Sequence, residues 1–235
     1  MIEVRNLVKT FRDGPLETRV LKGIDFTAAD GEFIAVMGRS GAGKSTLLYQ
    51  ISLLDEPTSG EILINRKEAH LLSEHEKMLF RLAEFGYVFQ DYALLPDLTA
   101  LENCILPLLM QGKDTRQAEA VATRALEKVN LAHRCRNLPS QLSGGQMQRV
   151  AIARALAVDP GIILADEPTG NLDSKTGQFI MDLLSRIHRE EGKTVIIVTH
   201  DLGLVRHAER VVHLKDGLVE KVEHNQQLRE KSRGG

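Results

Sequence analysis

The chain has no tryptophan, few aromatic residues (4%) and almost no excess charge, since its formal net charge is −2. A near-neutral balance gives no electrostatic basis for binding the phosphate backbone of a nucleic acid. The scarcity of aromatic rings also argues against a platform on which bases stack. We therefore expect no nucleic-acid partner.

Cysteines and long apolar runs are equally scarce. The two cysteines, Cys104 and Cys135, are far apart and show no CxxC spacing, which is typical of free thiols in a reducing compartment. No apolar run approaches the ~20 residues that span a bilayer. The first residues also lack the basic and then apolar pattern of a signal peptide. We expect a cytoplasmic protein that reaches a membrane through a partner.

Apolar runs that alternate with helical stretches predict an α/β fold with a mostly parallel sheet covered on both faces. The expected strands are residues 32–37, 61–64, 86–89, 161–165 and 194–199, and the expected helices are residues 46–54, 73–84, 143–157 and 174–189. A hairpin over residues 210–220 turns at Asp216 and Gly217. The chain of 235 residues fits a single domain, with its α/β core in residues 1–90 and 142–220.

The middle of the chain, residues 91–141, has a helical pattern and predicts a helical subdomain inserted into the α/β core. Asp114 is a suitable N-cap. Apolar residues follow it at helical spacing, namely Ala118, Val121, Ala122, Ala125, Leu126 and Val129. Three prolines are expected to break the helices, namely Pro96, Pro107 and Pro139. The polar tail, residues 221–235, is expected to fray.

A P-loop lies between an apolar strand and a helix, and it predicts binding of ATP and Mg²⁺. It comprises Gly38, Arg39, Ser40, Gly41, Ala42, Gly43, Lys44 and Ser45. Its glycines let backbone N–H groups surround a phosphate, and the helix from Thr46 adds its positive end. We expect Lys44 to reach the β- and γ-phosphates and Ser45 to coordinate Mg²⁺.

Four further residues stand at the ends of predicted strands. Asp166 can hold Mg²⁺ through water, and Glu167 is well placed to accept a proton from an attacking water. His200 is expected to sense the γ-phosphate, and Gln90 to reach Mg²⁺ or the water. The alternatives are a solvated acidic turn for the carboxylates and a structural role for the histidine. A second Asp-Glu-Pro-Thr segment, residues 55–58, follows a helix end and is interpreted as a turn.

A second glycine-rich segment, residues 142–146 (LSGGQ), opens a helix that continues as QRVAIARAL over residues 148–156. Ser143 would cap this helix, and its glycines permit close approach to an anion. The segment resembles the signature of the ABC ATPases. The P-loop, Gln90, residues 162–167, Asp173 and His200 also occur in that family's order. The resemblance implies a P-loop core, an N-terminal antiparallel β part and an inserted helical subdomain.

The same resemblance implies a head-to-tail dimer that holds two ATP molecules between its subunits. Ser143, Gly144, Gly145 and Gln146 would contact the ATP in the opposite P-loop, and Asp173 would lie at the dimer seam. Phe11 occupies the place of an aromatic ring that stacks on adenine, with a packing role as the alternative. Both half-sites are complete in this sequence, which favours a homodimer.

Residues 85–90 (FGYVFQ) and 94–103 (LLPDLTALEN) resemble the ATPases of lipoprotein-releasing and macrolide-export systems. Such ATPases drive a membrane permease and are thought to transmit force across the bilayer. The helical subdomain would contact the permease, with Tyr92, Leu94 and Leu95 as candidates for the contact or for core packing. We expect an ATPase that is peripheral at the inner face of the cell membrane.

Three alternative functions can be compared with the sequence, and its motifs do not separate the first of them from export. Cell-division relatives regulate wall hydrolases with the same ATPase and transport nothing. ABC proteins that act on ribosomes usually carry two ATPase domains, and those that act on DNA carry coiled coils or zinc modules, none of which occurs here. A nucleotide kinase would leave the LSGGQ segment unexplained.

Overall fold

The computed structural model describes residues 1–224, and its centre is a six-stranded sheet in the order β10-β9-β3-β8-β7-β6. The strands are β3 (Phe33–Met37), β6 (Phe85–Val88), β7 (Ile162–Asp166), β8 (Thr194–Thr199), β9 (Arg210–Lys215) and β10 (Leu218–His224). All neighbouring strands are parallel except β10, which pairs with β9 in an antiparallel hairpin. The predicted parallel α/β fold is confirmed.

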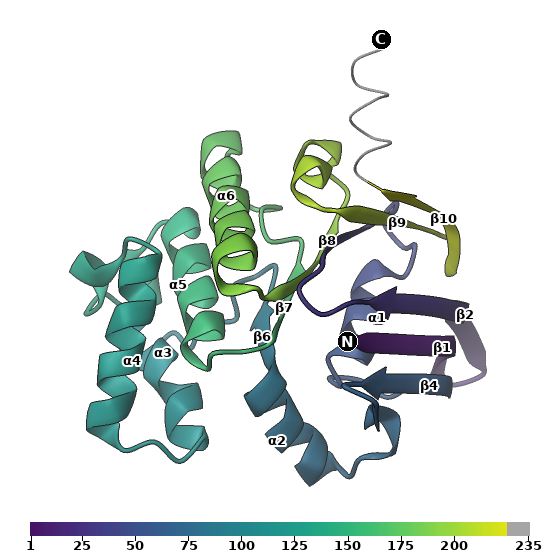
Figure 1. Cartoon of the computed structure of the whole chain (residues 1–235), viewed down its shortest axis with the longest axis horizontal. Coiled ribbons are helices and arrows are strands. Elements are labelled where there is room, and N and C mark those ends of the chain that lie inside the picture. Colours follow the sequence, from purple (N-terminus) through teal and green to yellow (C-terminus); the bar gives the residue numbers. More distant parts are fainter. Residues whose placement is uncertain (225–235) are drawn as a thin grey trace.

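The strands β3, β7 and β8 are buried along their whole length, because apolar layers cover both faces of the sheet. Phe33 and Ala35 face a core that they share with α5 (Gly144–Ala157) and α6 (Ser174–Glu191). Ile34 and Val36 face the opposite core, which contains α1 (Lys44–Ile51) and the N-terminal sheet. Successive strand side chains point to opposite faces, so a run that is apolar throughout requires both layers. Figure 1 shows the central strands between these layers.

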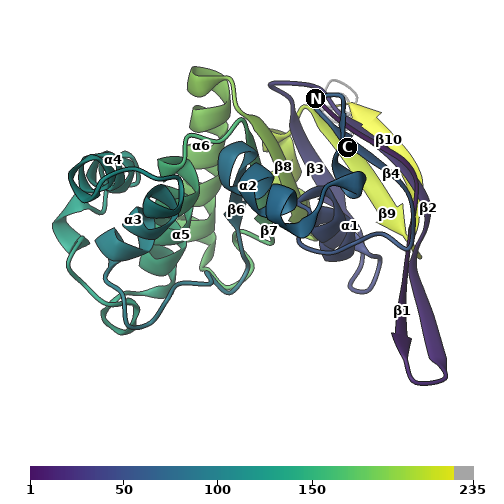
Figure 2. The same cartoon turned by 90° about the horizontal axis from the view of Figure 1, so that it is seen from below.

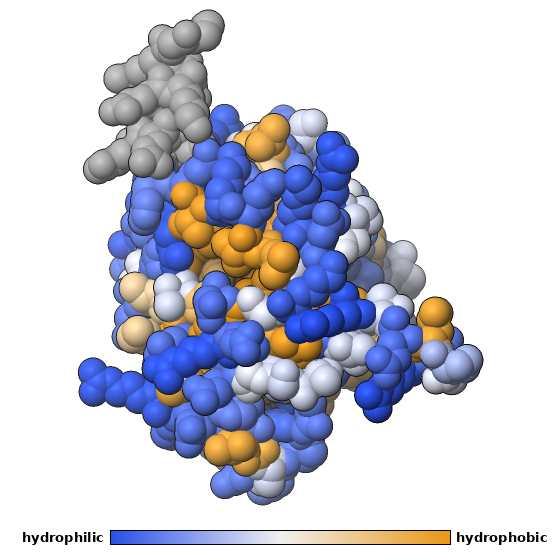
Figure 3. Space-filling model, turned by 90° about the vertical axis from the view of Figure 1, so that its right-hand side faces the viewer, coloured by the Kyte–Doolittle hydropathy of each residue, from blue (hydrophilic) through white to orange (hydrophobic). Residues whose placement is uncertain are grey.

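The predicted N-terminal antiparallel part is a four-stranded sheet in the order β2-β1-β4-β5. Its strands are β1 (Ile2–Asp13), β2 (Leu16–Ala28), β4 (Ser59–Ile64) and β5 (Lys67–Glu68). The ends of β1 and β2 form a hairpin arm that projects beyond the rest of the sheet (Figure 2). On the side of the molecule that shows this sheet, apolar residues gather within a mostly hydrophilic surface (Figure 3).

The middle of the chain forms the helices α3 (Ala100–Met110) and α4 (Thr115–Lys128), which pack against each other and against α5. Thr99 and Asp114 cap them, so the predicted N-cap at Asp114 is confirmed. The prediction that Pro107 breaks the helix is wrong, because this residue lies within α3. It lies near the C-terminal end, where its missing N–H removes one helical bond and its own carbonyl still accepts from Gln111 N.

Several element boundaries differ from those expected by a few residues, and two of the differences affect the helix after the P-loop and the tail. The helix after the P-loop begins at Lys44 instead of Thr46 and ends at Ile51, because Leu53 takes a left-handed conformation with φ of 58°. The first tail residues, 221–224, do not fray but continue β10 in the hairpin. Residues 225–235 lie outside the described part of the chain.

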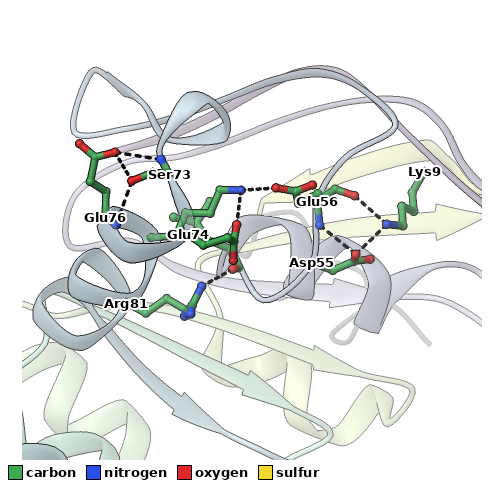
Figure 4. A network of polar contacts seen from close by, with 9 residues as sticks. Lys9, Asp55, Glu56, Ser73, Glu74, Glu76 and Arg81 are labelled. Carbon is green, nitrogen blue, oxygen red and sulfur yellow. Dashed lines mark hydrogen bonds and ion pairs between the residues drawn. The ribbon is translucent and has the colours of Figure 1, made fainter. Parts of the chain in front are cut away.

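A polar network fixes α2 (Glu74–Glu84) to the loop after α1 (Figure 4). Lys77 is 5% exposed and donates hydrogen bonds to Glu56 and Glu74. Asp55 accepts from Lys9 and from Gln50. The segment of residues 55–58 is therefore a structural loop, as the sequence indicated.

Candidate functional site

The P-loop joins the end of β3 to the start of α1, and its backbone requires glycine. Gly41 and Gly43 have φ of 80° and 96°, which side chains rarely tolerate. A Cβ on Gly43 would also lie 2.8 Å from Leu21 Cδ2. Lys44 is 8% exposed, and its Nζ donates to Arg39 O at 3.2 Å, so the lysine crosses back over the loop.

The hydroxyl of Ser45 and the carboxylate of Asp166 meet at the carboxyl ends of two parallel strands. Ser45 Oγ donates to Asp166 Oδ1 at 2.9 Å, although the residues are 121 positions apart. Asp166 is 4% exposed, and this burial raises its pKa; the bond from Ser45 opposes the rise. A hydroxyl and a buried carboxylate are the hard oxygen donors that Mg²⁺ prefers, so the two residues fit this ion.

Glu167 lies beside this pair in a constrained backbone conformation. Its φ of 44° is unusual for a residue other than glycine, and its N–H donates to Val198 O at 2.9 Å. Its Oε1 lies 2.9 Å from His200 Nδ1 and 3.9 Å from Lys44 Nζ. The side chain is 12% exposed, whereas that of His200 is 69% exposed. The glutamate is therefore oriented by a histidine that remains open to solvent.

Gln90 follows β6, is exposed, and lies next to the loop that carries Gly170 and Asn171. Its carbonyl accepts from Asn171 Nδ2 at 3.1 Å. Its Nε2 lies near Gly170, 3.6 Å from where a Cβ on that glycine would stand. Within residues 1–224 no hydrogen bond joins the Gln90 side chain to Ser45, Asp166 or Glu167.

The LSGGQ segment begins α5, and Ser143 caps this helix as expected. Ser143 Oγ accepts from Gln146 N at 3.3 Å, and Gln146 Oε1 accepts from Ser143 N at 2.9 Å. A Cβ on Gly144 would lie 2.9 Å from Tyr92 Oη, and one on Gly145 would collide with Thr176. Among the described residues, no hydrogen bond or ion pair connects this segment with the P-loop.

Two remaining predicted site residues lie apart from the P-loop. Asp173 caps α6 and accepts from Lys175 N, Thr176 N and Thr176 Oγ1, and these hydrogen bonds lower its pKa. Phe11 is on the hairpin arm and is 45% exposed. Lys9 Nζ lies 4.9 Å from the centroid of its ring.

An apolar groove of about 340 Å³ opens between α2, β6, α3 and α5. Its lining includes Leu54, Met78, Leu82, Phe85, Tyr87 and Met110. The suggested contact residues lie elsewhere. Leu94 packs against the core of the helical layer, Tyr92 lies against Gly144, and Leu95 is outside the groove lining. The groove gave no sequence signal, because its residues come from four separate segments.

The comparisons with known proteins agree with this geometry. The sequence profile described as "ABC transporter" matches residues 21–170, which is more than half of the chain. The chain belongs to the ABC transporter family. It is an ATP-binding and ATP-hydrolysing subunit of such a transporter.

Two relatives illustrate the match in sequence. The uncharacterized ABC transporter ATP-binding protein MJ0796 of Methanocaldococcus jannaschii is 48% identical over 95% of this chain and 97% of its own length. The lipoprotein-releasing system ATP-binding protein LolD of Geobacter metallireducens is 47% identical over 93% of this chain and 97% of its own length.

Solved structures confirm the fold of an ABC ATPase. The dimeric ATP-binding cassette MJ0796 in a post-hydrolysis state, bound to ADP and Pi, matches with a TM-score of 0.91 and 44% identity over 96% of this chain and 99% of that chain. CbiO1 of Clostridium perfringens, part of the transporter complex cbiONQ, matches with a TM-score of 0.86 and 29% identity over 98% and 91%. In the part of this chain that the structure describes, no helix is long and apolar enough to cross a bilayer.

The burial of Asp166 predicts a pH-dependent cost in stability for the metal-free protein. Because burial raises the folded-state pKa above the usual 3.8, the ionised carboxylate is disfavoured by folding. This cost is fully present above the folded-state pKa and disappears below pH 3.8, where both states are protonated. We expect Asp166→Asn to raise Tm at pH 7 and to lose this advantage as the pH falls below 4.

Differential scanning fluorimetry in EDTA across pH 3.5–8 measures the effect. Asp97→Asn, which removes an exposed carboxylate, is the control for net charge. An Asp166→Asn protein that is less stable than the wild type at pH 7 would contradict the assignment of a burial cost.

Proposed function

We propose that this subunit closes on ATP as a head-to-tail homodimer and that hydrolysis drives a membrane permease of the lipoprotein-releasing or macrolide-export type. The observation that carries the proposal is the convergence of Lys44, Ser45, Asp166, Glu167 and His200 at one edge of the parallel sheet. Lys44 supplies a cation, and Ser45 and Asp166 supply a hydroxyl and a buried carboxylate. Glu167 supplies the base, and His200 is its hydrogen-bond partner.

In the proposed mechanism the P-loop and Lys44 would bind the phosphates, and Ser45 and Asp166 would hold Mg²⁺, with Gln90 as a further candidate ligand. The ion would neutralise charge on the phosphates during hydrolysis. Glu167 would accept the proton of the attacking water, since its carboxylate lies 3.9 Å from the lysine that would bind the γ-phosphate and is therefore close to the reacting group. His200 Nδ1 would donate to Glu167 Oε1 and so keep the carboxylate turned toward the γ-phosphate.

The second half of the site is proposed to act on the ATP of the partner subunit. Ser143, Gly144, Gly145 and Gln146 begin a 14-residue helix whose positive end suits an anion. They make no hydrogen bond to their own P-loop within residues 1–224, which supports a role in trans. Asp173 would lie at the seam and Phe11 would stack on adenine from its exposed position on the arm.

The apolar groove is proposed as the docking site for a short helix of the permease. It offers a largely apolar lining from four elements, which is typical of a surface that takes the apolar face of a helix. An ATPase held through this groove would be peripheral at the cytoplasmic face of the membrane. The permease type is supported by relatives named LolD, which are 44–47% identical to this chain.

Replacing the proposed base, Glu167→Gln, should keep ATP binding and stop turnover. The amide retains the size of the side chain but does not accept a proton, so we expect kcat to fall by about 10²–10⁴-fold. ATP should then hold the subunits together as a stable dimer. Steady-state ATPase assays and size-exclusion chromatography with ATP provide the measurements. Full hydrolysis by the variant would remove Glu167 as the base.

A bulky cation at the signature, Ser143→Arg, should leave nucleotide binding to the isolated subunit intact and prevent the ATP-dependent dimer. Ser73→Arg is the matched control, because Ser73 caps α2 with the same capping box but lies outside the signature. Both variants are made in the Glu167→Gln background and compared by light scattering. ATP-dependent dimers of the Ser143→Arg protein would count against the shared site.

The permease contact is tested by isolating the Glu167→Gln protein with ATP from native membranes and identifying co-purified proteins by mass spectrometry. Leu82→Glu, which places a charge in the groove, should abolish recovery of the permease. Leu79→Glu, on the same helix but outside the groove lining, should not. A permease with a large external domain and a lipoprotein or efflux partner supports export, whereas a permease-like protein bound to a wall hydrolase supports the regulatory alternative.

A further inference from the structure

Gln148 is a buried amide whose hydrogen-bonding capacity is only partly used. It lies on α5, two residues after Gln146, and is 1% exposed. Its Nε2 donates to Pro168 O at 2.8 Å, while its Oε1 has no hydrogen-bond partner. A buried amide with an unpaired oxygen is less favourable than an apolar side chain of the same size. Packing alone therefore does not account for a glutamine at this position.

The acceptor of this bond belongs to the residue that directly follows Glu167. Pro168 is buried, and its carbonyl lies in the short loop between β7 and α6. The rest of the loop is held from other sides. Glu167 N donates to Val198 O in β8, and Glu167 O accepts from Gly170 N at 3.0 Å. Asn171 Nδ2 also donates to Gln90 O, further along the loop. Gln148 adds an attachment from α5 at the residue next to Glu167.

The conformation of Glu167 makes such an attachment useful. A φ of 44° is a sparsely populated state for a residue with a side chain, and it persists where surrounding contacts hold it. Rotation about the backbone bonds of Glu167 would move its carboxylate away from His200 Nδ1 and Lys44 Nζ. The bond to Pro168 O opposes this rotation, because it fixes the orientation of the next carbonyl.

We propose that Gln148 is a positioning residue for Glu167, and that it makes the orientation of the carboxylate depend on the placement of α5. This inference rests on the proposed roles of Glu167 and of the signature. Ser143 caps this helix, and Gln148 is the fifth residue within it. When the signature binds the partner's ATP, a movement of α5 would therefore be transmitted through Gln148 to the loop that carries Glu167.

The test replaces the amide without emptying its volume. Gln148→Met removes the unpaired oxygen but also leaves Pro168 O without its donor, so the two effects on stability oppose each other and the protein should still fold. We expect kcat for ATP to fall at least tenfold while KM and the affinity for ATP change less than twofold. In the Glu167→Gln background the variant should still form the ATP dimer. Gln148→Asn keeps the amide but shortens the side chain by one methylene. It should likewise lower kcat at least tenfold and change KM less than twofold.

Gln111→Met is the matched control, because Gln111 Nε2 also donates to main-chain carbonyls, those of Leu82 and Val158, away from Glu167. It should keep the wild-type kcat. Hydrogen exchange measured by mass spectrometry should show faster exchange of residues 167–172 in Gln148→Met and not in Gln111→Met.

Two outcomes would overturn the inference. One is a folded Gln148→Met protein with kcat within twofold of the wild type. The other is a loss of kcat that is matched by an equal loss of ATP affinity or of dimerisation, since that would show a general structural role. The single variant Glu167→Gln tests the proposed function separately from this inference. If that variant were fully active, Glu167 would not be the base, whatever the result for Gln148.

Discussion

The parallel pairing of β3, β8 and β7 is the constraint on which the rest of the structure depends. Parallel strands bring their carboxyl ends to one edge of a sheet, so Lys44, Asp166 and His200 come from distant parts of the chain and meet there. Two apolar layers are needed to bury such strands, and those layers supply the helices that carry the P-loop and the signature. The meeting of these side chains at one edge and the stability of the core therefore both follow from the same strand pairing.

Features encoded in contiguous residues could be predicted from the sequence, and features assembled across elements could not. A few adjacent residues are enough to recognise the P-loop, the cap at Ser143 and the strand before Asp166. The position of Pro107 within α3 was not predicted. The energetic cost of a proline in a helix depends on its distance from the helix end, and the local sequence does not reveal where α3 ends. The groove and the bond from Gln148 to Pro168 were invisible because they join segments brought together only by folding.

Helix α5 has two ends with different surroundings. Its first turn carries the signature, and Arg154 and Ala155 in its last turn line the apolar groove. A helix of 14 residues spans about 21 Å and is stiff over that length. The element that would meet the partner's nucleotide and the element that would meet the permease are thus one rigid body, so displacement at one end necessarily moves the other.

The separation of the LSGGQ segment from its own P-loop has a kinetic consequence. When a reaction centre is divided between two copies of a chain, an isolated copy contains no complete centre. Specific activity in dilute solution then rises with protein concentration until the copies are paired. A permease that holds two copies side by side replaces this second-order step with a local concentration fixed by the complex. With the site shared as proposed, ATP hydrolysis would be confined to paired subunits, and single subunits would hydrolyse little ATP.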